Sequence, residues 1–223
     1  MIAEPGEYEM LTHTYQTTRP FLYHLTDRAN LAHIRETNEL CPAAFLMEAA
    51  GRFELLQHRR RCHEQVMVGK TVILLRDQAP LHKGNISFED GYTFDSFVES
   101  LNRRVFFWPG TVRGPISYGI RHFERYQKER PIVLRLLMQS VLGSNPTSQP
   151  LYCKYNSGSP RCSYGSKSAR GANTFVPAGD FAGTPSTVVE VTFQEPITLP
   201  ADAEYAGRPS GPWRSLRTAA KRE

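Results

Sequence analysis

Short apolar segments, interleaved irregularly with amphipathic ones, constrain the fold of this chain more than any other feature. The segments rich in β-branched or aromatic residues have the length of strands, and they are residues 20–25, 104–108, 132–137, 188–193 and 197–199. Apolar residues at three- and four-residue steps predict helices over about 27–36, 43–56, 94–101 and 116–123. Strands and helices do not alternate regularly, and no longer period repeats. The pattern therefore predicts one α+β domain rather than a doubly wound sheet.

Three segments are harder to interpret. Periodicity alone does not decide whether residues 72–76 form a short buried strand or a helical turn. Arg59, Arg60 and Arg61 are expected to be the solvated end of the helix predicted before them. Residues 152–187 are rich in Gly and Ser and are expected to form a long structureless loop, which in a compact domain usually carries function.

The positive charge of the chain is concentrated at its C-terminus. The formal net charge is +5, and residues 208–223 contribute +4 of it, which leaves +1 for residues 1–207. Residues 1–18 are polar and unpatterned. We therefore expect a flexible N-terminal segment over 1–18, a single domain over 19–207 and a basic flexible tail over 208–223.

The N-terminus and the cysteines bear on the location of the protein. Residues 1–9 are acidic and lack the basic start and apolar stretch of a secretory signal, and no apolar run approaches the roughly 18–20 residues of a membrane helix. Cys41, Cys62, Cys153 and Cys162 lack paired short spacing, so a zinc site that used Cys153, Cys162 and Cys62-His63 is the weaker alternative to reduced thiols. The sequence predicts a cytoplasmic protein without a membrane span or a metal.

Basic and aromatic residues are mixed in the long segment. Residues 152–180 have a net charge of +3 and include four aromatic side chains, namely Tyr152, Tyr155, Tyr164 and Phe175. Cations suit phosphates and rings suit unstacked bases, so Arg161, Lys167 and Arg170 are candidates for contacting a nucleic acid. An ordinary polar surface loop is the alternative.

Three separated segments together resemble the DarT-type DNA ADP-ribosyltransferases. Tyr-His-Leu-Thr at 23–26, followed by Asn30 and Leu31, resembles the strand and helix that open that domain. Arg-Val-Phe-Phe-Trp at 104–108 resembles the aromatic strand below its nicotinamide pocket, and Val-Glu-Val-Thr-Phe at 189–193 resembles the strand that bears its catalytic glutamate. A set of uncharacterised bacterial proteins shares these motifs together with Leu-Arg-Asp-Gln, Asn-Ser-Gly and Arg-Gly-x-x-Thr-Phe.

The resemblance implies an ADP-ribosyltransferase-like split β-sheet core with flanking helices and NAD as co-substrate. Glu190 would be the catalytic carboxylate, because a fixed carboxylate stabilises the cation that develops when the bond between nicotinamide and ribose breaks. Arg76 would hold the diphosphate. The remaining candidates would bind the ribose or form the aromatic slot for nicotinamide, and they are His24, Thr26, Asn30, Phe106, Phe107, Trp108 and Tyr118.

Each residue also has a structural interpretation. His24 alone fits a hydrogen-bonded core histidine, and Glu190 alone fits a strand residue that points to solvent. Arg76 alone fits a salt bridge with Asp77 or a surface position. Their occurrence in one order, at suitable separations, favours the functional interpretation.

The leading hypothesis is an NAD-dependent ADP-ribosyltransferase that modifies a nucleic acid, of the kind found in toxins and phage-defence effectors, with an antitoxin as a further partner. One alternative is an NAD glycohydrolase that uses the same pocket with water as acceptor. Another is a non-catalytic module that binds nucleic acid or an ADP-ribose-like ligand. The sequence does not separate the first two, while Glu190 disfavours the third.

Overall fold

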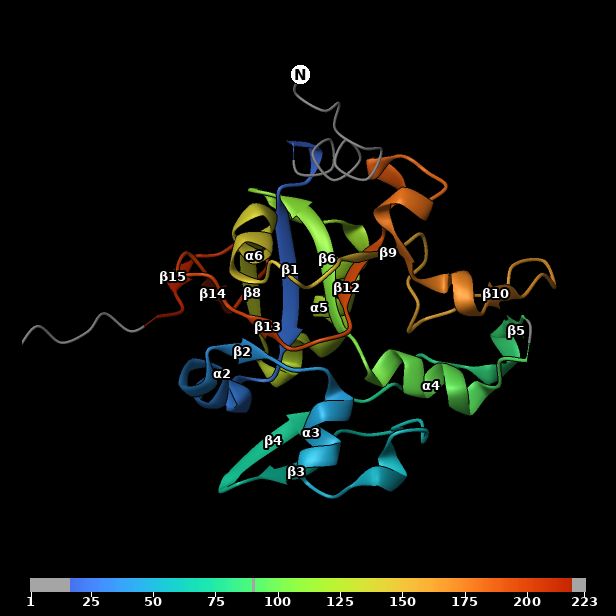
Figure 1. The fold of residues 1–223 in the computed structure, drawn as a ribbon, viewed down its shortest axis with the longest axis horizontal. Coiled ribbons are helices and arrows are strands. Elements are labelled where there is room, and N and C mark those ends of the chain that lie inside the picture. Colours follow the sequence, from blue (N-terminus) through green and yellow to red (C-terminus); the bar gives the residue numbers. More distant parts are fainter. Residues whose placement is uncertain (1–16, 90, 218–223) are drawn as a thin grey trace, which may run out of the picture.

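An antiparallel sheet of nine strands forms the centre of the fold (Figure 1). The computed structural model describes residues 17–89 and 91–217. In sheet order the strands are β11 (Val176–Pro177), β9 (Leu151–Cys153), β12 (Glu190–Phe193), β6 (Val105–Thr111), β1 (Phe21–Thr26), β8 (Ile132–Leu137), β14 (Glu204–Ala206) and β15 (Arg214–Ser215), with β7 (Gly114–Pro115) paired to β6. The strands far apart in sequence that carry the predicted motifs, β1, β6 and β12, are therefore direct neighbours.

Helices and three small sheets surround the main sheet, which confirms the α+β class. The α-helices are α2 (Leu31–Thr37), α3 (Ala43–Ala49), α4 (Phe94–Asn102), α5 (Ser117–Tyr126) and α6 (Met138–Ser144). The small sheets pair β3 (Glu64–Val68) with β4 (Thr71–Leu75), β2 (Glu39–Leu40) with β13 (Ile197–Thr198), and β5 (Ile86–Phe88) with β10 (Ser168–Arg170). In Figure 1, α3 and the β3–β4 hairpin lie below the main sheet.

Single turns of 3-10 helix connect these elements. They are η1 (Arg28–Asn30), η2 (Phe53–Leu55), η3 (Lys83–Asn85), η4 (Gln127–Glu129), η5 (Ala172–Thr174), η6 (Ala178–Asp180) and η7 (Pro185–Thr187). The segment over 152–187, which we expected to be structureless, thus contains β10, β11, three of these turns and part of β9.

The largest hydrophobic core lies against the central strands. Leu22, Phe107, Leu134 and Val191 are fully buried in it, and each comes from a different strand of the main sheet. Successive side chains of a strand point to opposite faces. The neighbours of Phe107 in β6 consequently point away from this core.

The helix predicted over 43–56 is too long. Helix α3 ends at Ala49, and Gly51 has a φ of +68°, a conformation that glycine adopts without strain. Phe53, which the periodicity assigned to the buried face, is 62% exposed. Residues 72–76, left open between strand and helix, form most of β4 with Leu75 as its last residue.

The C-terminal boundary also differs from the prediction. Leu216 is 2% exposed and belongs to the largest core, and the Trp213 ring lies 5.9 Å from the Tyr23 ring. Residues 208–217 are therefore part of the domain rather than of a flexible tail, because an edge strand and two apolar side chains fix them. Of the predicted N-terminal segment 1–18 and the predicted tail 208–223, residues 1–16 and 218–223 lie outside the described residues.

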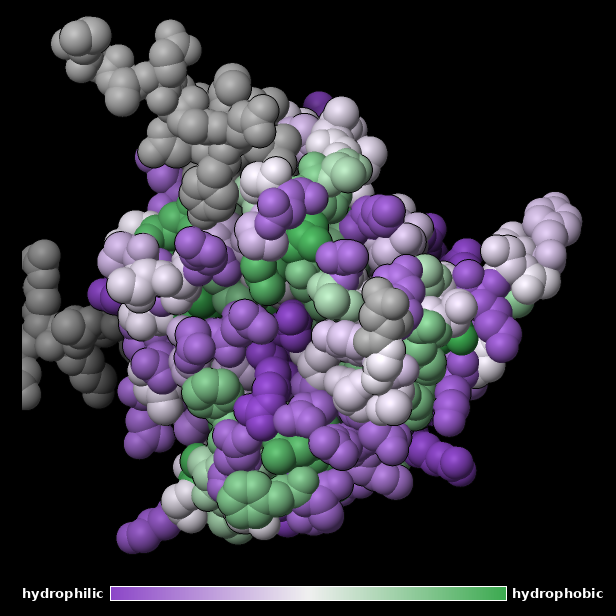
Figure 2. All heavy atoms as spheres, turned by 45° about the vertical axis from the view of Figure 1, so that its right-hand side comes forward, coloured by the Kyte–Doolittle hydropathy of each residue, from purple (hydrophilic) through white to green (hydrophobic). Residues whose placement is uncertain are grey.

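The face of the molecule drawn in Figure 2 is mostly hydrophilic. Figure 2 shows hydrophilic side chains gathered across the middle of one face, with smaller hydrophobic patches above and below. Within residues 17–89 and 91–217, no helix is long and apolar enough to cross a membrane.

Candidate functional site

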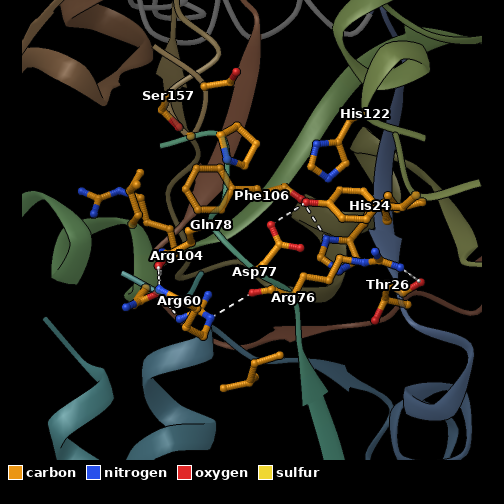
Figure 3. Close-up of a pocket in the computed structure, with 18 of the residues that line it drawn as sticks. His24, Thr26, Arg60, Arg76, Asp77, Gln78, Arg104, Phe106, His122 and Ser157 are labelled. Carbon is orange, nitrogen blue, oxygen red and sulfur yellow. Dashed lines mark hydrogen bonds between the residues drawn. The ribbon is translucent and has the colours of Figure 1, made fainter. Parts of the chain in front are cut away.

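A pocket of about 280 Å³ lies where β1, β4, β6 and β12 approach one another (Figure 3). It brings together most of the residues that the sequence motifs singled out, which are His24, Thr26, Asn30, Arg76, Phe106, Trp108 and Glu190. Further polar residues line it that the sequence analysis assigned no role in the pocket: Arg60, Asp77, Gln78, Asn102, Arg104, His122, Tyr126 and the segment Asn156–Ser159. Segments from many separate parts of the chain, between His24 and Glu190, thus build one site.

Strand β6 supplies the aromatic wall. Phe106 and Trp108 line the pocket, whereas Phe107 points to the opposite face and is fully buried in the core. Gly119 allows α5 to approach this wall, since a Cβ atom there would lie 3.1 Å from Cγ of Trp108. Phe107 is therefore a core residue, and its assignment to cofactor binding does not fit its position.

Tyr118 also lies outside the pocket. Its ring is covered by the guanidinium of Arg121, with Cζ 4.7 Å from the ring centroid. On the same helix α5, His122 takes the place that we assigned to Tyr118, and its ring centroid lies 4.7 Å from that of Trp108. Burial, together with the charges of Arg76 and Arg125, lowers the His122 pKa to about 3, so the ring is neutral at physiological pH.

Glu190 is the buried carboxylate of the pocket. It is 4% exposed, so it does not point to solvent, and its Oε1 accepts a hydrogen bond of 3.1 Å from the backbone N–H of Ser157. Its Oε2 is buried without a hydrogen-bond partner among the described residues. Burial raises the pKa of Glu190 to about 7, while the Ser157 hydrogen bonds and the charge of Arg170 act in the opposite direction.

Arg170 lies behind Glu190 and not on the surface of a loop. It is 2% exposed, its Nη1 donates to the carbonyl of Ala169 at 2.8 Å, and its Cζ lies 4.2 Å from the centroid of the Tyr155 ring. Burial lowers the pKa of Arg170. A residue so enclosed is not a surface contact for a nucleic acid, because its guanidinium reaches only the interior around Glu190.

Arg161 and Lys167 remain exposed. Neither lines the pocket, and neither forms an ion pair with a described residue. The three basic residues that we grouped as nucleic-acid contacts thus occupy two different environments.

Three further arginines line the pocket itself. Arg76 lies above the Tyr126 ring at 4.6 Å, and its Nη1 contacts the Glu129 carboxylate at 3.0 Å, so its partner is not Asp77. Its Nε is buried without a hydrogen-bond partner in the described part of the chain, as is the Nε of Arg104. Buried N–H groups without partners are rare in folded proteins and favour a ligand that accepts hydrogen bonds.

Arg60, which we expected at the solvated end of a helix, is buried. It is 6% exposed, its Nε donates to the carbonyl of Arg76 at 2.9 Å and its Nη1 donates to Oδ1 of Asn102 at 2.8 Å. It is therefore enclosed beside the pocket and is not the solvated end of a helix. Burial lowers its pKa to about 10, and no described carboxylate forms an ion pair with it.

His24 presents one nitrogen to the pocket. Its Nδ1 lies 2.9 Å from the carbonyl oxygen of Phe106, and because a carbonyl only accepts, Nδ1 carries the proton. Burial lowers the pKa of His24, so the ring is neutral and Nε2 is an acceptor. A ligand hydroxyl is the natural donor to it.

Asn30 and Thr26 hold the pocket together. Nδ2 of Asn30 donates to the carbonyl of Leu74 at 2.9 Å, and its Oδ1 accepts from the N–H of Leu74 at 2.9 Å. Nδ2 also lies 3.2 Å from Oγ1 of Thr26. The two bonds with Leu74 join the helix start after β1 to β4, the strand that leads to Arg76, and the third joins it to the end of β1. Asn30 therefore has a structural role in addition to its position in the wall.

The sequence contains a local signal for some of these pocket residues and none for others. Ser157 belongs to the Asn-Ser-Gly motif that we noted without a role, and Arg104 belongs to the aromatic-strand motif. His122 and Arg60 carry no local signal, since only the tertiary structure brings them to the pocket.

Among the described residues, no group of three or more His, Cys, Asp or Glu side chains could hold a metal ion, and all four cysteines are free.

Comparison with known proteins gives one match. A family model described as a family of unknown function (DUF7002) matches residues 20–203, a range that contains every residue of the pocket. No curated protein and no solved structure matches the chain. Since the family model covers most of the chain, the protein belongs to the DUF7002 family.

Proposed function

We propose that this protein is an NAD-dependent ADP-ribosyltransferase with an ADP-ribosyltransferase-like sheet core, in which Glu190 is the catalytic residue. One observation carries the proposal: a buried carboxylate oxygen without a partner lies in a pocket that is also lined by arginines and aromatic rings. NAD combines an anionic diphosphate, ribose hydroxyls and a flat cationic ring, and the pocket offers a complementary group for each.

The proposed contacts follow from the chemistry of the lining. The guanidinium groups of Arg76 and Arg104 have unpartnered N–H groups that suit the diphosphate. Nε2 of His24 suits a ribose hydroxyl, since it accepts hydrogen bonds. The rings of Phe106 and Trp108 offer an apolar slot for nicotinamide.

Glu190 would act on the charge that appears during reaction. When the bond between the anomeric carbon and the nicotinamide nitrogen breaks, its electron pair neutralises the pyridinium and leaves positive charge on the ribose. The ionised Glu190 stabilises that charge through Oε2, while Ser157 holds Oε1 in place. The acceptor then bonds to the anomeric carbon and loses its proton.

The acceptor in this proposal is a nucleic acid, as in the toxin and phage-defence proteins that the motifs resemble. An antitoxin would be a further partner. The bases of a single strand are unstacked and can enter a pocket, whereas a duplex hides them.

The test is to incubate the purified protein with labelled NAD, separately with single-stranded DNA, RNA, a protein extract or buffer. We expect release of nicotinamide that depends on a nucleic acid, with ADP-ribose retained on that acceptor. Equal release in buffer alone would identify a glycohydrolase. Binding of NAD without release would identify a non-catalytic module, and either result would contradict the proposed transferase.

A further inference from the structure

A second pocket, of about 350 Å³, lies at the C-terminal edge of the sheet, where Arg28 follows the end of β1. Three arginines line it, namely Arg28, Arg208 and Arg214, together with Tyr205 and residues of the turn 206–212. Ile132, which lines this second pocket, pairs in the sheet with Thr26, which lines the main pocket. One lining residue of each pocket thus lies opposite the other across strands β1 and β8.

The structure fixes the backbone of this second pocket. The sequence alone suggested a mobile basic tail here, but Pro209 and Gly211 are buried, and the N–H of Gly211 donates to the carbonyl of Arg208 at 3.1 Å. Trp213 and Leu216 anchor the following residues in the core. Arg208 and Arg214 thus project from a rigid edge of the sheet, at the left of Figure 1, where β14 and β15 lie.

Arg28 reaches the same place from the other side. A Cβ atom on Gly207 would lie 3.9 Å from Nη2 of Arg28, so the guanidinium rests against the turn that carries Arg208. The Nε of Arg28 donates to the carbonyl of Arg130 at 3.4 Å, which holds the side chain in this direction.

The positive charge of the second pocket is not compensated. No Asp or Glu lines it, and none of its three arginines forms an ion pair with a described residue. Hydrogen bonds from Arg35 and Arg214, and then their charges, lower the pKa of Tyr205, which agrees with a positive potential at this site. Three guanidinium groups around one hollow match the several oxygens of a phosphate.

We propose that this second pocket binds a phosphate group of a single-stranded nucleic acid and so holds the acceptor strand beside the main pocket. The identity of the acceptor rests on the proposed function, while the phosphate site rests on the three arginines. This arrangement assigns phosphate binding to the C-terminal edge of the sheet and not to the exposed loop that carries Arg161 and Lys167. A phosphate of NAD or free inorganic phosphate is the other source of the same chemistry.

The experiment measures binding of a fluorescent single-stranded oligonucleotide by anisotropy, without NAD. The test variant replaces Arg28, Arg208 and Arg214 by alanine. The matched control replaces three exposed basic residues elsewhere, Arg61, Lys70 and Lys83, and so loses the same net charge. We expect the test variant to bind on the order of tenfold more weakly, with the slope of log K against log salt reduced by about 2, while the control keeps the slope of the parent.

Three results would overturn the proposal. The first is that the parent fails to bind the oligonucleotide. The second is that the control loses as much affinity and salt slope as the test variant. The third is that NAD or inorganic phosphate displaces the oligonucleotide from the parent at millimolar concentration. The thermal unfolding midpoint of the test variant, compared with that of the parent, reports whether its fold is intact. Because the assay uses no NAD turnover, its outcome is independent of whether the protein proves to be a transferase.

Discussion

Ser157 and Glu190 are joined by a hydrogen bond of 3.1 Å from the Ser157 N–H to Oε1 of the carboxylate. This bond uses one oxygen of Glu190 and leaves the other, Oε2, buried within the pocket without a partner. It also ties the segment Asn156–Ser159, which lines the pocket, to strand β12. The geometry orients the carboxylate while keeping one oxygen available to a ligand.

The protonation of Glu190 predicts a pH dependence of the proposed reaction. Burial raises its pKa to about 7, and only the ionised form stabilises a cation, so kcat/KM for nicotinamide release should rise with pH and level off above about 7. Arg170 acts to lower this pKa, so Arg170→Gln should move the midpoint to higher pH. The matched control is Arg161→Gln, an exposed arginine of the same segment. If Arg170→Gln and Arg161→Gln give the same pH profile of kcat/KM, the charge of Arg170 does not lower the pKa of Glu190 and the prediction is wrong.

The same pKa has a consequence for stability. The ordinary value for the group is 4.5 and the folded value is about 7, so between these pH values the folded state binds more protons than the unfolded state. The contribution of Glu190 is therefore most favourable below pH 4.5 and is lost as the pH rises to about 7. A buried carboxylate that costs stability at neutral pH is typical of a functional group.

His24 and Arg76 should contribute to binding of NAD. Replacing Arg76 by alanine removes a hydrogen bond that involves a charged group, which is worth about 1.5–3 kcal/mol, or roughly 10- to 150-fold in Kd. Replacing the neutral His24 removes an uncharged hydrogen bond, which is worth about 0.5–1.5 kcal/mol, or roughly 2- to 13-fold. Calorimetry on the folded variants measures this directly. Arg121→Ala removes an exposed arginine outside the pocket and should bind like the parent. If His24→Ala and Arg76→Ala also bind like the parent, NAD does not occupy this pocket.

Asn30 should be needed mainly for stability. Asn30→Ala leaves the N–H and the carbonyl of Leu74 without their side-chain partner, at a cost of about 1–3 kcal/mol for each buried group that water does not reach. Urea denaturation provides the free energy of unfolding. Asn173→Ala makes the same change at an exposed site and should cost almost nothing. Equal stability of the two variants would mean that the bridge between η1 and β4 is dispensable.

Much of the site could be predicted from the sequence because its residues lie on strands with clear patterns. His24, Phe106, Trp108 and Glu190 each belong to a short apolar run, and the order of the runs agreed with a known arrangement. Alternation along β6 would have separated Phe107 from its neighbours, since a strand sends successive side chains to opposite faces.

The remainder depends on contacts between segments far apart in the chain. Arg60 is buried because Asn102 and the carbonyl of Arg76 satisfy it, and nothing near it in sequence reveals those partners. The apolar periodicity of residues 43–56 did not reveal that helix α3 ends at Ala49, shortly before Gly51 with its positive φ. The basic composition of residues 208–223 concealed an edge strand, because Trp213 and Leu216 are too few to form an apolar pattern.

Leu216 should stabilise the whole domain. Leu216→Ala removes a side chain that is 2% exposed from the largest core, which typically costs about 2–5 kcal/mol. Val112→Ala truncates a side chain that is 67% exposed and is the control. Thermal unfolding should show a lower Tm for Leu216→Ala alone. A Tm equal to that of the parent would mean that Leu216 does not stabilise the domain, and would support the flexible tail that the sequence suggested.

The most direct test of the central claim is nicotinamide release by Glu190→Gln, measured beside its affinity for NAD. The substitution keeps the shape of the side chain and its acceptor for the Ser157 N–H but removes the negative charge. We expect NAD to bind with a Kd close to that of the parent and turnover to fall by about 10²-fold or more, because the charge acts mainly in the transition state. A Glu190→Gln variant that releases nicotinamide at the rate of the parent would show that Glu190 is not the catalytic residue and would contradict the account.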